Sequence, residues 1–248
     1  MKMADEKEQS KMSRRRFMRN SGYVAGGAIG GGILGSLLGT NLLDTNQETA
    51  QETNDYNRAL MFFTRQKDFD ILSAATERIF PEDENGPGAI ALGVPYFIDH
   101  QLAGSYGNNE KEYMQGPFSP GTDYQGYQSP LKRNELFLVG IQALEDESMN
   151  NYNTTFTELE GEQQDELLQA FQNNGVGIKG ATSATFFETM RSATLEGAYS
   201  DPLYGGNANM DGWRMKEFPG SQMSFIDELD SEDFIEMEPN ALRSHISH

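Results

Sequence analysis

The sequence offers few side chains that could carry out catalysis. Its 248 residues include no cysteine, which excludes disulfides, thiolate metal sites, iron–sulfur clusters and covalently attached haem c in this polypeptide. Of the three histidines, His100 lies in an apolar helical pattern, whereas His245 and His248 lie at the C-terminal end. One histidine in the folded body leaves no basis for a Ser-His-Asp arrangement. We interpret His100 as a packed or partner-facing side chain, with an acid/base or metal-ligand role as the alternative.

A second group of candidate ligands follows residue 200. Asp201, Asn207 and Asp211 could supply oxygen ligands to a cation such as Ca²⁺. Their spacing matches no EF-hand loop, so we interpret them as residues that cap turns, with a cation site as the alternative. The segment Gly26–Gly35 superficially suggests a dinucleotide loop, but no strand precedes it. We therefore predict no catalytic, cofactor-binding or metal-binding residue in this chain.

Residues 196–220, which include this second group, are rich in residues that fix turns. Glycine pairs and Pro202 favour tight turns, and the single tryptophan of the chain, Trp213, lies among them. Such a loop fits a partner interface, because tyrosine and tryptophan on a rigid loop are typical anchors, and it equally fits a purely structural clasp. The candidate interface residues are Tyr199, Asp201, Pro202, Tyr204, Gly205, Gly206, Asn207 and Trp213.

The segments that must position this loop follow helical patterns. Apolar residues recur at three- and four-residue spacing over residues 62–80, with Thr64 as the expected N-cap and Pro81 as the stop. A second pattern covers residues 87–102. Pro95 lies inside it and predicts a break or kink, because proline lacks the amide hydrogen that a helix interior needs.

Three more helices are expected further along the chain. Residues 104–130 are rich in Gly, Pro and Tyr and should form a long ordered loop, and a third helix should run from about 131 to 149. Thr157 and Glu160 stand in capping-box spacing before a fourth helix. The fifth spans about Ser183–Tyr199, and no segment shows a sustained strand pattern.

We predict an all-α fold with one compact domain of five or six helices and long ordered loops, preceded by an N-terminal signal or anchor helix. The expected organisation is a signal at 1–43, a polar linker at 44–60, the helical domain at 61–220 and an acidic C-terminal tail at 221–248. The acidic stretch Asp227–Asp233 of the tail is interpreted as a solvated end.

The N-terminus has the pattern of a twin-arginine export signal. Ser13, Arg14, Arg15, Phe17 and Met18 fit the pattern S/T-R-R-x-F-L-K, with Met in the place of Leu, and a charge-free Gly-rich stretch follows. The pattern predicts export by the twin-arginine translocase of a protein folded beforehand, alone or with a bound partner. The alternative is a basic amphipathic arm followed by a small-residue transmembrane helix.

The apolar stretch after this signal is expected to persist as a membrane anchor. Residues 23–43 are long enough to cross about 30 Å of hydrocarbon as a helix. No A-x-A cleavage signature and no lipobox cysteine follows them. We expect the folded domain on the outer face of the cytoplasmic membrane, on the periplasmic or extracellular side.

Charge is distributed unevenly along the chain. Residues 1–43 hold seven of the 19 Lys and Arg and three of the 38 Asp and Glu, so the remainder carries 12 bases against 35 acids. Such a body repels phosphate backbones and anionic lipid head groups, which argues against nucleic-acid binding. The excess of acids fits both a protein adapted to high salt and an ordinarily acidic exported protein.

Several blocks of the sequence resemble a known family. They are Pro87-Gly88-Ala89, Leu92-Gly93-Val94, Tyr96-Phe97-Ile98-Asp99, Tyr113 with Gly116-Pro117, Phe186-Phe187, Glu196-Gly197 through Tyr204-Gly205-Gly206-Asn207, and Gly212-Trp213. Over about residues 62–220 the chain resembles the small subunit (subunit 3, or gamma) of membrane-bound gluconate 2-dehydrogenase and related FAD-dependent sugar and polyol dehydrogenases. It departs from the family at Ala198, at Met215–Gly220 and in the acidic tail.

The resemblance implies a non-catalytic subunit. Small subunits of this family bind a large flavoprotein of the glucose-methanol-choline class that lacks its own signal, and they carry it across the membrane. FAD is then expected in the partner, and electrons leave through a cytochrome c subunit or a quinone. Two alternatives remain: a free-standing exported enzyme that uses the loop from Asp201 to Asp211, and an exported scaffold protein without a redox role.

Overall fold

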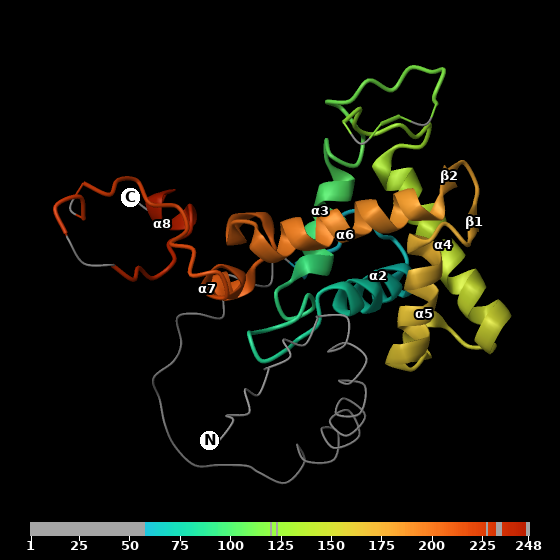
Figure 1. Cartoon of the computed structure of the whole chain (residues 1–248), viewed down its shortest axis with the longest axis horizontal. Helices are drawn as coiled ribbons and strands as arrows, with labels where there is room; N and C mark the ends of the chain where they lie inside the picture. Colours follow the sequence, from blue (N-terminus) through green and yellow to red (C-terminus); the bar gives the residue numbers. More distant parts are fainter. Residues whose placement is uncertain (1–57, 120, 123, 227, 232–234, 247–248) are drawn as a thin grey trace, which may run out of the picture. The chain divides into compact units, whose positions relative to one another are not determined.

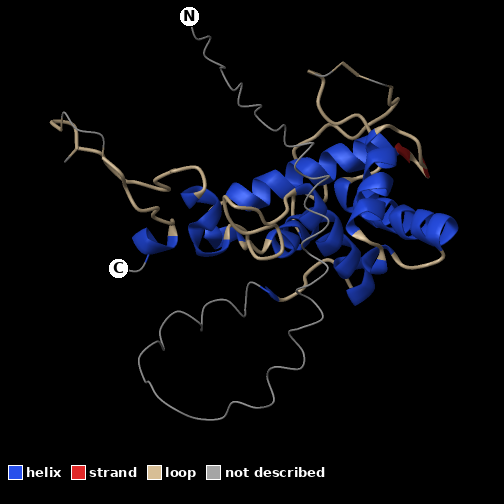
Figure 2. Cartoon of the chain, turned by 60° about the horizontal axis from the view of Figure 1, so that its bottom comes forward, coloured by secondary structure: helices blue, strands red, loops and turns tan. Residues whose placement is uncertain are grey.

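The regular structure of the domain is almost entirely helical, as the spacing of its apolar residues predicts. The computed structural model describes residues 58–119, 121–122, 124–226, 228–231 and 235–246 (Figure 1). Among these residues, five α-helices have ten residues or more and two have four, and the strands form a single short hairpin (Figure 2). The predicted all-α fold is confirmed. The signal residues, the 23–43 stretch and the first part of the linker lie outside the described residues.

Five longer helices build the domain. They are α2 (Gln66–Ile79), α3 (Val94–Ala103), α4 (Arg133–Tyr152), α5 (Gly161–Gln172) and α6 (Ser183–Tyr199). The fifth predicted helix is confirmed with the expected bounds, and the Thr182 hydroxyl caps it by accepting a hydrogen bond from the amide of Thr185. The hairpin of β1 (Gly177–Ile178) and β2 (Ala181–Thr182) leads directly into it.

Helix α6 is the central element of the core. It packs against α2, α3, α4 and α5, and Figure 1 shows it running in orange across α3. The ring of Phe186 on α6 meets Phe137 of α4 and Phe171 of α5 edge to face, at centroid distances of 5.8 and 5.9 Å. All three rings are fully buried, so the aromatic residues of this helix form core, as their helical spacing indicates.

Two helix starts differ from the sequence predictions. Arg65, not Thr64, is the N-cap of α2, and its side chain pairs at 2.8 Å with Asp68 in the first turn, where a carboxylate also favours the helix dipole. Of the break or kink predicted at Pro95, the structure shows a break: α3 begins only at Val94, and its first turn tolerates the missing amide hydrogen of Pro95. The residues before it form turns instead of helix.

The predicted capping box of the fourth helix is shifted by one helical turn. Glu160 is the N-cap of α5 and Gln163 completes the box, since each side chain accepts from the other's backbone amide. Thr157 instead lies in the short 3₁₀ helix η4 (Phe156–Glu158). Two boxes fit the same sequence, and the structure uses the later one because Phe156 is buried in the core ahead of it.

One arginine of α4 contacts both ends of the 104–130 loop, of which the structure describes all residues but 120 and 123. The guanidinium of Arg133 lies over the rings of Tyr106 and Tyr127, at 4.5 and 5.1 Å from their centroids. It also pairs at 2.7 Å with Glu112. The peptide bond between Gly116 and Pro117 is cis.

In the part of the chain that the structure describes, no helix has the length and apolar character needed to cross a bilayer.

Candidate functional site

Apart from Tyr199, the last residue of α6, the candidate interface lies in the loop that follows this helix, which we call the clasp and define as residues 200–220. It contains η5 (Pro202–Tyr204), η6 (Ala208–Met210) and the short helix α7 (Asp211–Arg214). Its backbone is left-handed at Gly205, Asn207, Asn209 and Met210. Asparagine and glycine tolerate that conformation better than other residues, so the local sequence favours this path at the first three of these positions but not at Met210.

The clasp folds directly onto the last turn of α6. A side chain at Gly206 would overlap the carbonyl oxygen of Gly197, and one at Gly212 would overlap that of Ala198. Both positions are buried, so no side chain larger than hydrogen fits without moving backbone. The glycine pairs therefore serve backbone packing within this chain.

The oxygen-bearing side chains of the clasp are engaged with its own backbone. One carboxylate oxygen of Asp201 accepts the amide of Leu203 at 2.9 Å. Asn207 is fully buried; it donates to the carbonyl of Ser200 and accepts the amide of Gly212, both at 2.8 Å. The turn-capping interpretation is confirmed for these two residues.

Asp211 does not join them. Its carboxylate pairs at 3.0 Å with Arg214 in the same short helix. No three His, Asp or Glu side chains among the described residues are grouped so that they could hold a metal ion. The cation alternative therefore has no supporting geometry in the described clasp.

Trp213 faces inward. Its side chain is only 6 % exposed, its indole nitrogen donates to the carbonyl of Tyr199 at 2.8 Å, and Phe218 meets its ring edge to face at 5.4 Å. Tyr199 in turn lies edge to face against Phe80, with a centroid distance of 5.8 Å. Both rings thus join the clasp to α6 and to the end of α2.

The outer side of the clasp is apolar at the η5 turn. Tyr204 is 52 % exposed and Leu203 is 38 % exposed. The turn before α3 lies beside the clasp, because the amide of Ala208 donates to the carbonyl of Leu92 at 3.0 Å. That turn exposes a further apolar side chain, Ile90. We call Ile90, Leu203 and Tyr204 the clasp face.

The eight candidate interface residues therefore fall into different environments. Tyr204 is exposed, Tyr199, Pro202 and Gly205 are half-buried, and Asp201, Gly206, Asn207 and Trp213 are buried. Sequence reasoning missed Leu203 and Ile90. Their only signal was an apolar residue type in a turn, which is equally typical of core.

His100 and Asp99 hold the chain where it enters the domain. The buried carboxylate of Asp99 accepts the amides of Met61, Phe62 and Phe63, at 2.5 to 3.1 Å. The half-buried His100 donates through Nε2 to the carbonyl of Ala59 at 2.9 Å. Sequence analysis did not single out Asp99 for a role of its own, although an acid directly after the apolar run Tyr96–Ile98 was a signal that it needs buried partners.

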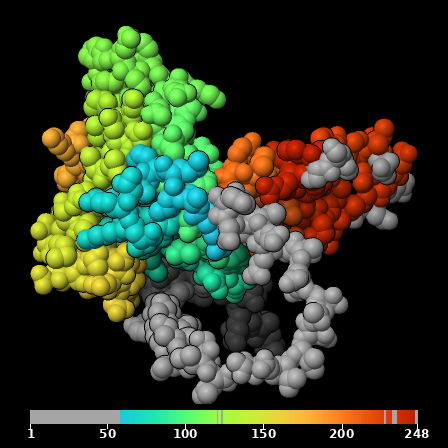
Figure 3. Space-filling view, turned by 180° about the vertical axis from the view of Figure 1, so that it is seen from behind, coloured from blue at the N-terminus to red at the C-terminus, as the bar shows by residue number. Residues whose placement is uncertain are grey.

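The C-terminal tail is folded on either side of its acidic stretch, whereas the described residues of that stretch are exposed, apart from the half-buried Glu228. Ser221 donates to the carbonyl of Asn240 at 2.7 Å, and Asn240 donates to Pro219 at 3.1 Å. The second carboxylate oxygen of Asp201 accepts the amide of Leu242 at 2.8 Å, just before the short helix α8 (Arg243–Ile246). Figure 3 shows these red residues beside the orange clasp. Hydrogen bonds between segments distant in sequence left no local pattern to predict this.

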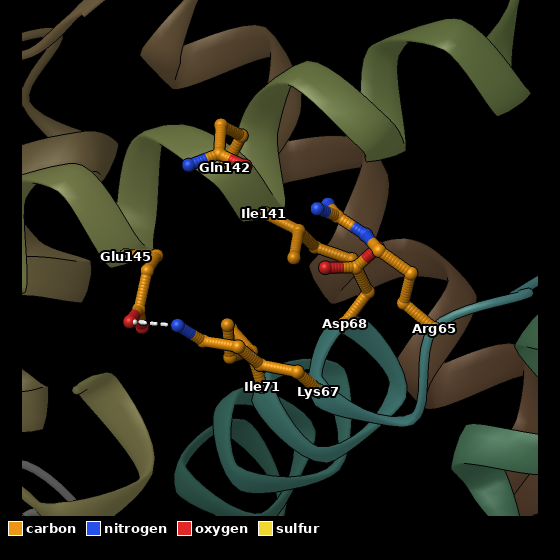
Figure 4. A pocket seen from close by; sticks show the side chains of 7 residues that line it. All are labelled: Arg65, Lys67, Asp68, Ile71, Ile141, Gln142 and Glu145. Atoms are coloured by element: carbon orange, nitrogen blue, oxygen red, sulfur yellow. Dashed lines mark hydrogen bonds and ion pairs between the residues drawn. The ribbon is translucent and has the colours of Figure 1, made fainter.

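A small cavity lies between α2 and α4 (Figure 4). Its volume is about 150 Å³, and Arg65, Lys67, Asp68, Ile71, Ile141, Gln142 and Glu145 line it. Lys67 pairs with Glu145 at 2.6 Å, and Arg65 pairs with Asp68, so the charges in it are matched. The pair of Lys67 and Glu145 joins the two helices, and no nucleophilic side chain that lines the cavity is left unpaired.

Glu145 also joins these two helices to η4. Burial alone would raise its pKa, but its hydrogen bonds with Lys67, the Phe156 amide and the Thr155 hydroxyl outweigh burial and lower the pKa. A lowered pKa means that the charged form stabilises the fold above the ordinary glutamate pKa and that this stabilisation is lost in acid.

Together the fold and the clasp define a small all-α domain whose loops are held by its own backbone and by matched charges. The family model described as gluconate 2-dehydrogenase subunit 3 matches residues 66–220, which is more than half of the chain and includes the whole clasp. The chain belongs to the gluconate 2-dehydrogenase subunit 3 family, and the resemblance seen in its sequence is confirmed. No curated protein and no solved structure matches it significantly.

Proposed function

We propose that this chain is the non-catalytic small subunit of an exported, membrane-associated dehydrogenase that oxidises gluconate or a related sugar or polyol. The observation that carries the proposal is the family match over residues 66–220, because the family is named for a dehydrogenase subunit. FAD belongs to the large partner subunit, a flavoprotein of the glucose-methanol-choline class. A cytochrome c subunit is the proposed electron acceptor within the same complex.

The clasp face is the proposed contact with the flavoprotein. Ile90, Leu203 and Tyr204 are large apolar side chains that stay exposed although the turns bearing them are fixed by backbone hydrogen bonds. An apolar anchor on a rigid turn loses little conformational entropy when a partner covers it. The buried residues of the clasp position this face and do not touch the partner.

Export is the second part of the proposal. The pattern at Ser13–Met18 directs the folded chain to the twin-arginine translocase, and the bound flavoprotein crosses with it. Residues 23–43 then hold the complex at the outer face of the membrane.

The geometry of the clasp weakens the alternative that this chain is a free-standing enzyme. It relied on the oxygens between Asp201 and Asp211, and backbone amides and Arg214 engage them. The scaffold alternative differs from the proposal by one observable, which is flavin in the native complex.

Purification of the tagged chain from native membranes tests the proposal. We expect a co-purifying flavoprotein with FAD absorbance and dehydrogenase activity that uses an artificial electron acceptor. Recovery of the chain without any flavoprotein would contradict the proposed function. For export, replacement of Arg14, Arg15 and Arg16 together by Lys should leave the dehydrogenase in the cytoplasm, whereas the control K2R/K7R should not.

A further inference from the structure

Beyond the family domain, a loop of the tail exposes a group of apolar side chains. Met223, Phe225, Ile226 and Leu229 are all exposed, three of them by 70 % or more. Single exposed apolar residues are normal on protein surfaces. Four of them within seven residues are not, and such groups mark interaction sites in soluble proteins. We call the described residues 222–226 and 228–231 the tail loop.

The tail loop has a fixed base. The hydrogen bonds of Ser221 and Asn240 close it like the neck of an Ω-loop, and the Gln222 side chain donates to Pro219 at 2.8 Å. His245 of α8 donates through Nε2 to the carbonyl of Ser221 at 2.7 Å. A segment closed at its base has fewer conformations to lose on binding than a free tail has.

The base is also joined to the clasp. Asp201 accepts the amides of Leu203 and Leu242 with its two carboxylate oxygens, so one side chain holds the η5 turn and the end of the tail. The clasp face and the tail loop are therefore positioned by the same residue. A partner that covers one of them lies close to the base of the other.

Charge restricts what can cover the tail loop. Residues 221–242 contain seven Asp or Glu and no Lys or Arg. A second copy of the loop and an anionic lipid surface are both disfavoured by like-charge repulsion. A protein surface with an apolar groove bordered by Lys and Arg complements the loop in both respects.

We propose that Phe225, Ile226 and Leu229 dock into an apolar, basic-rimmed groove of the flavoprotein subunit and form a second contact beside the clasp face. This inference rests on the proposed function, because it takes the flavoprotein as the partner. The family match ends at residue 220, so the contact lies outside the segment that the family model matches.

Binding of the purified flavoprotein to the full chain tests this contact. The variant F225S/I226S/L229S should weaken the complex by about tenfold or more, as expected for loss of central apolar anchors. The control L138S/M149S removes two exposed apolar side chains from α4 and should change the dissociation constant by less than twofold. In the wild type the association rate should fall with added salt, and E228Q/D230N should reduce that dependence.

Two readouts keep the outcomes separate. Trp213 is the only tryptophan, so an unchanged emission maximum shows that a variant retains the clasp. If the emission maximum of the variant shifts, amide hydrogen exchange of residues 222–231 in the wild type decides between the outcomes. Protection of these residues in the complex supports the contact, and absence of protection overturns the contact. Unchanged affinity of a folded F225S/I226S/L229S variant overturns the tail-loop contact and leaves the proposed function intact. A wild-type chain that binds no flavoprotein overturns both.

Discussion

The two long loops of this domain are held in different ways. The clasp lies on α6 through its backbone, since Gly206 and Gly212 leave room only for hydrogen and Asn207 bonds two backbone groups from inside. In the 104–130 loop one side chain makes most of the charged and aromatic contacts, because Arg133 contacts two tyrosines and a glutamate, and hydrogen bonds of Gly107 and Asn109 with the start of α4 add to them. A substitution that disturbs backbone packing should disrupt the whole clasp, whereas loss of the Arg133 side chain should loosen only the 104–130 loop.

The largest effect is expected from G212A in the clasp. The added methyl group would overlap the carbonyl of Ala198, so the last turn of α6 or the clasp must move. Overpacking against backbone should lower the free energy of unfolding by about 3 kcal/mol. Urea unfolding followed by Trp213 fluorescence measures it, together with a red shift of the emission maximum as the indole becomes exposed.

G177A is the matched control. A methyl group at Gly177 would meet no atom within 4 Å. Its unfolding free energy should stay within about 0.5 kcal/mol of the wild type. A G212A protein as stable as G177A would contradict the backbone account of the clasp.

The sequence predicted this difference only in part. Helical spacing identified the helices, and α6 with its bounds, because each buries one apolar face against the others. It located the clasp through its glycines, Pro202 and Trp213. The inward direction of Trp213 and the contact between Asp201 and Leu242 depend on the tertiary fold, so no local pattern contained them. Likewise, the break or kink predicted at Pro95 is the start of α3, because spacing alone does not say where a helix begins.

An intermediate effect is expected from R133A at the 104–130 loop. The variant loses two cation–π contacts and the ion pair with Glu112, for which about 1–2 kcal/mol is reasonable in a largely buried site. Limited proteolysis should cut within residues 104–130 faster than in the wild type, while Trp213 emission stays unchanged. R191A, which alters an exposed residue of α6, is the control. Equal cleavage rates in R133A and R191A would show that another contact holds the loop.

The smallest effect is a loss of stability at alkaline pH that arises in the 104–130 loop. Burial raises the pKa of Tyr106 to about 12, although the charge of Arg133 opposes the rise. Because the folded pKa lies above the ordinary tyrosine value near 10, the stabilisation is complete below pH 10 and is lost as the pH rises toward 12. At pH 11 the loss should be about 1 kcal/mol. Y106F cannot ionise, so its stability should fall less steeply between pH 10 and 12. Identical slopes for Y106F and wild type would mean that Tyr106 ionises as readily in the folded domain as in the unfolded chain, and that Arg133 leaves its ring open to water.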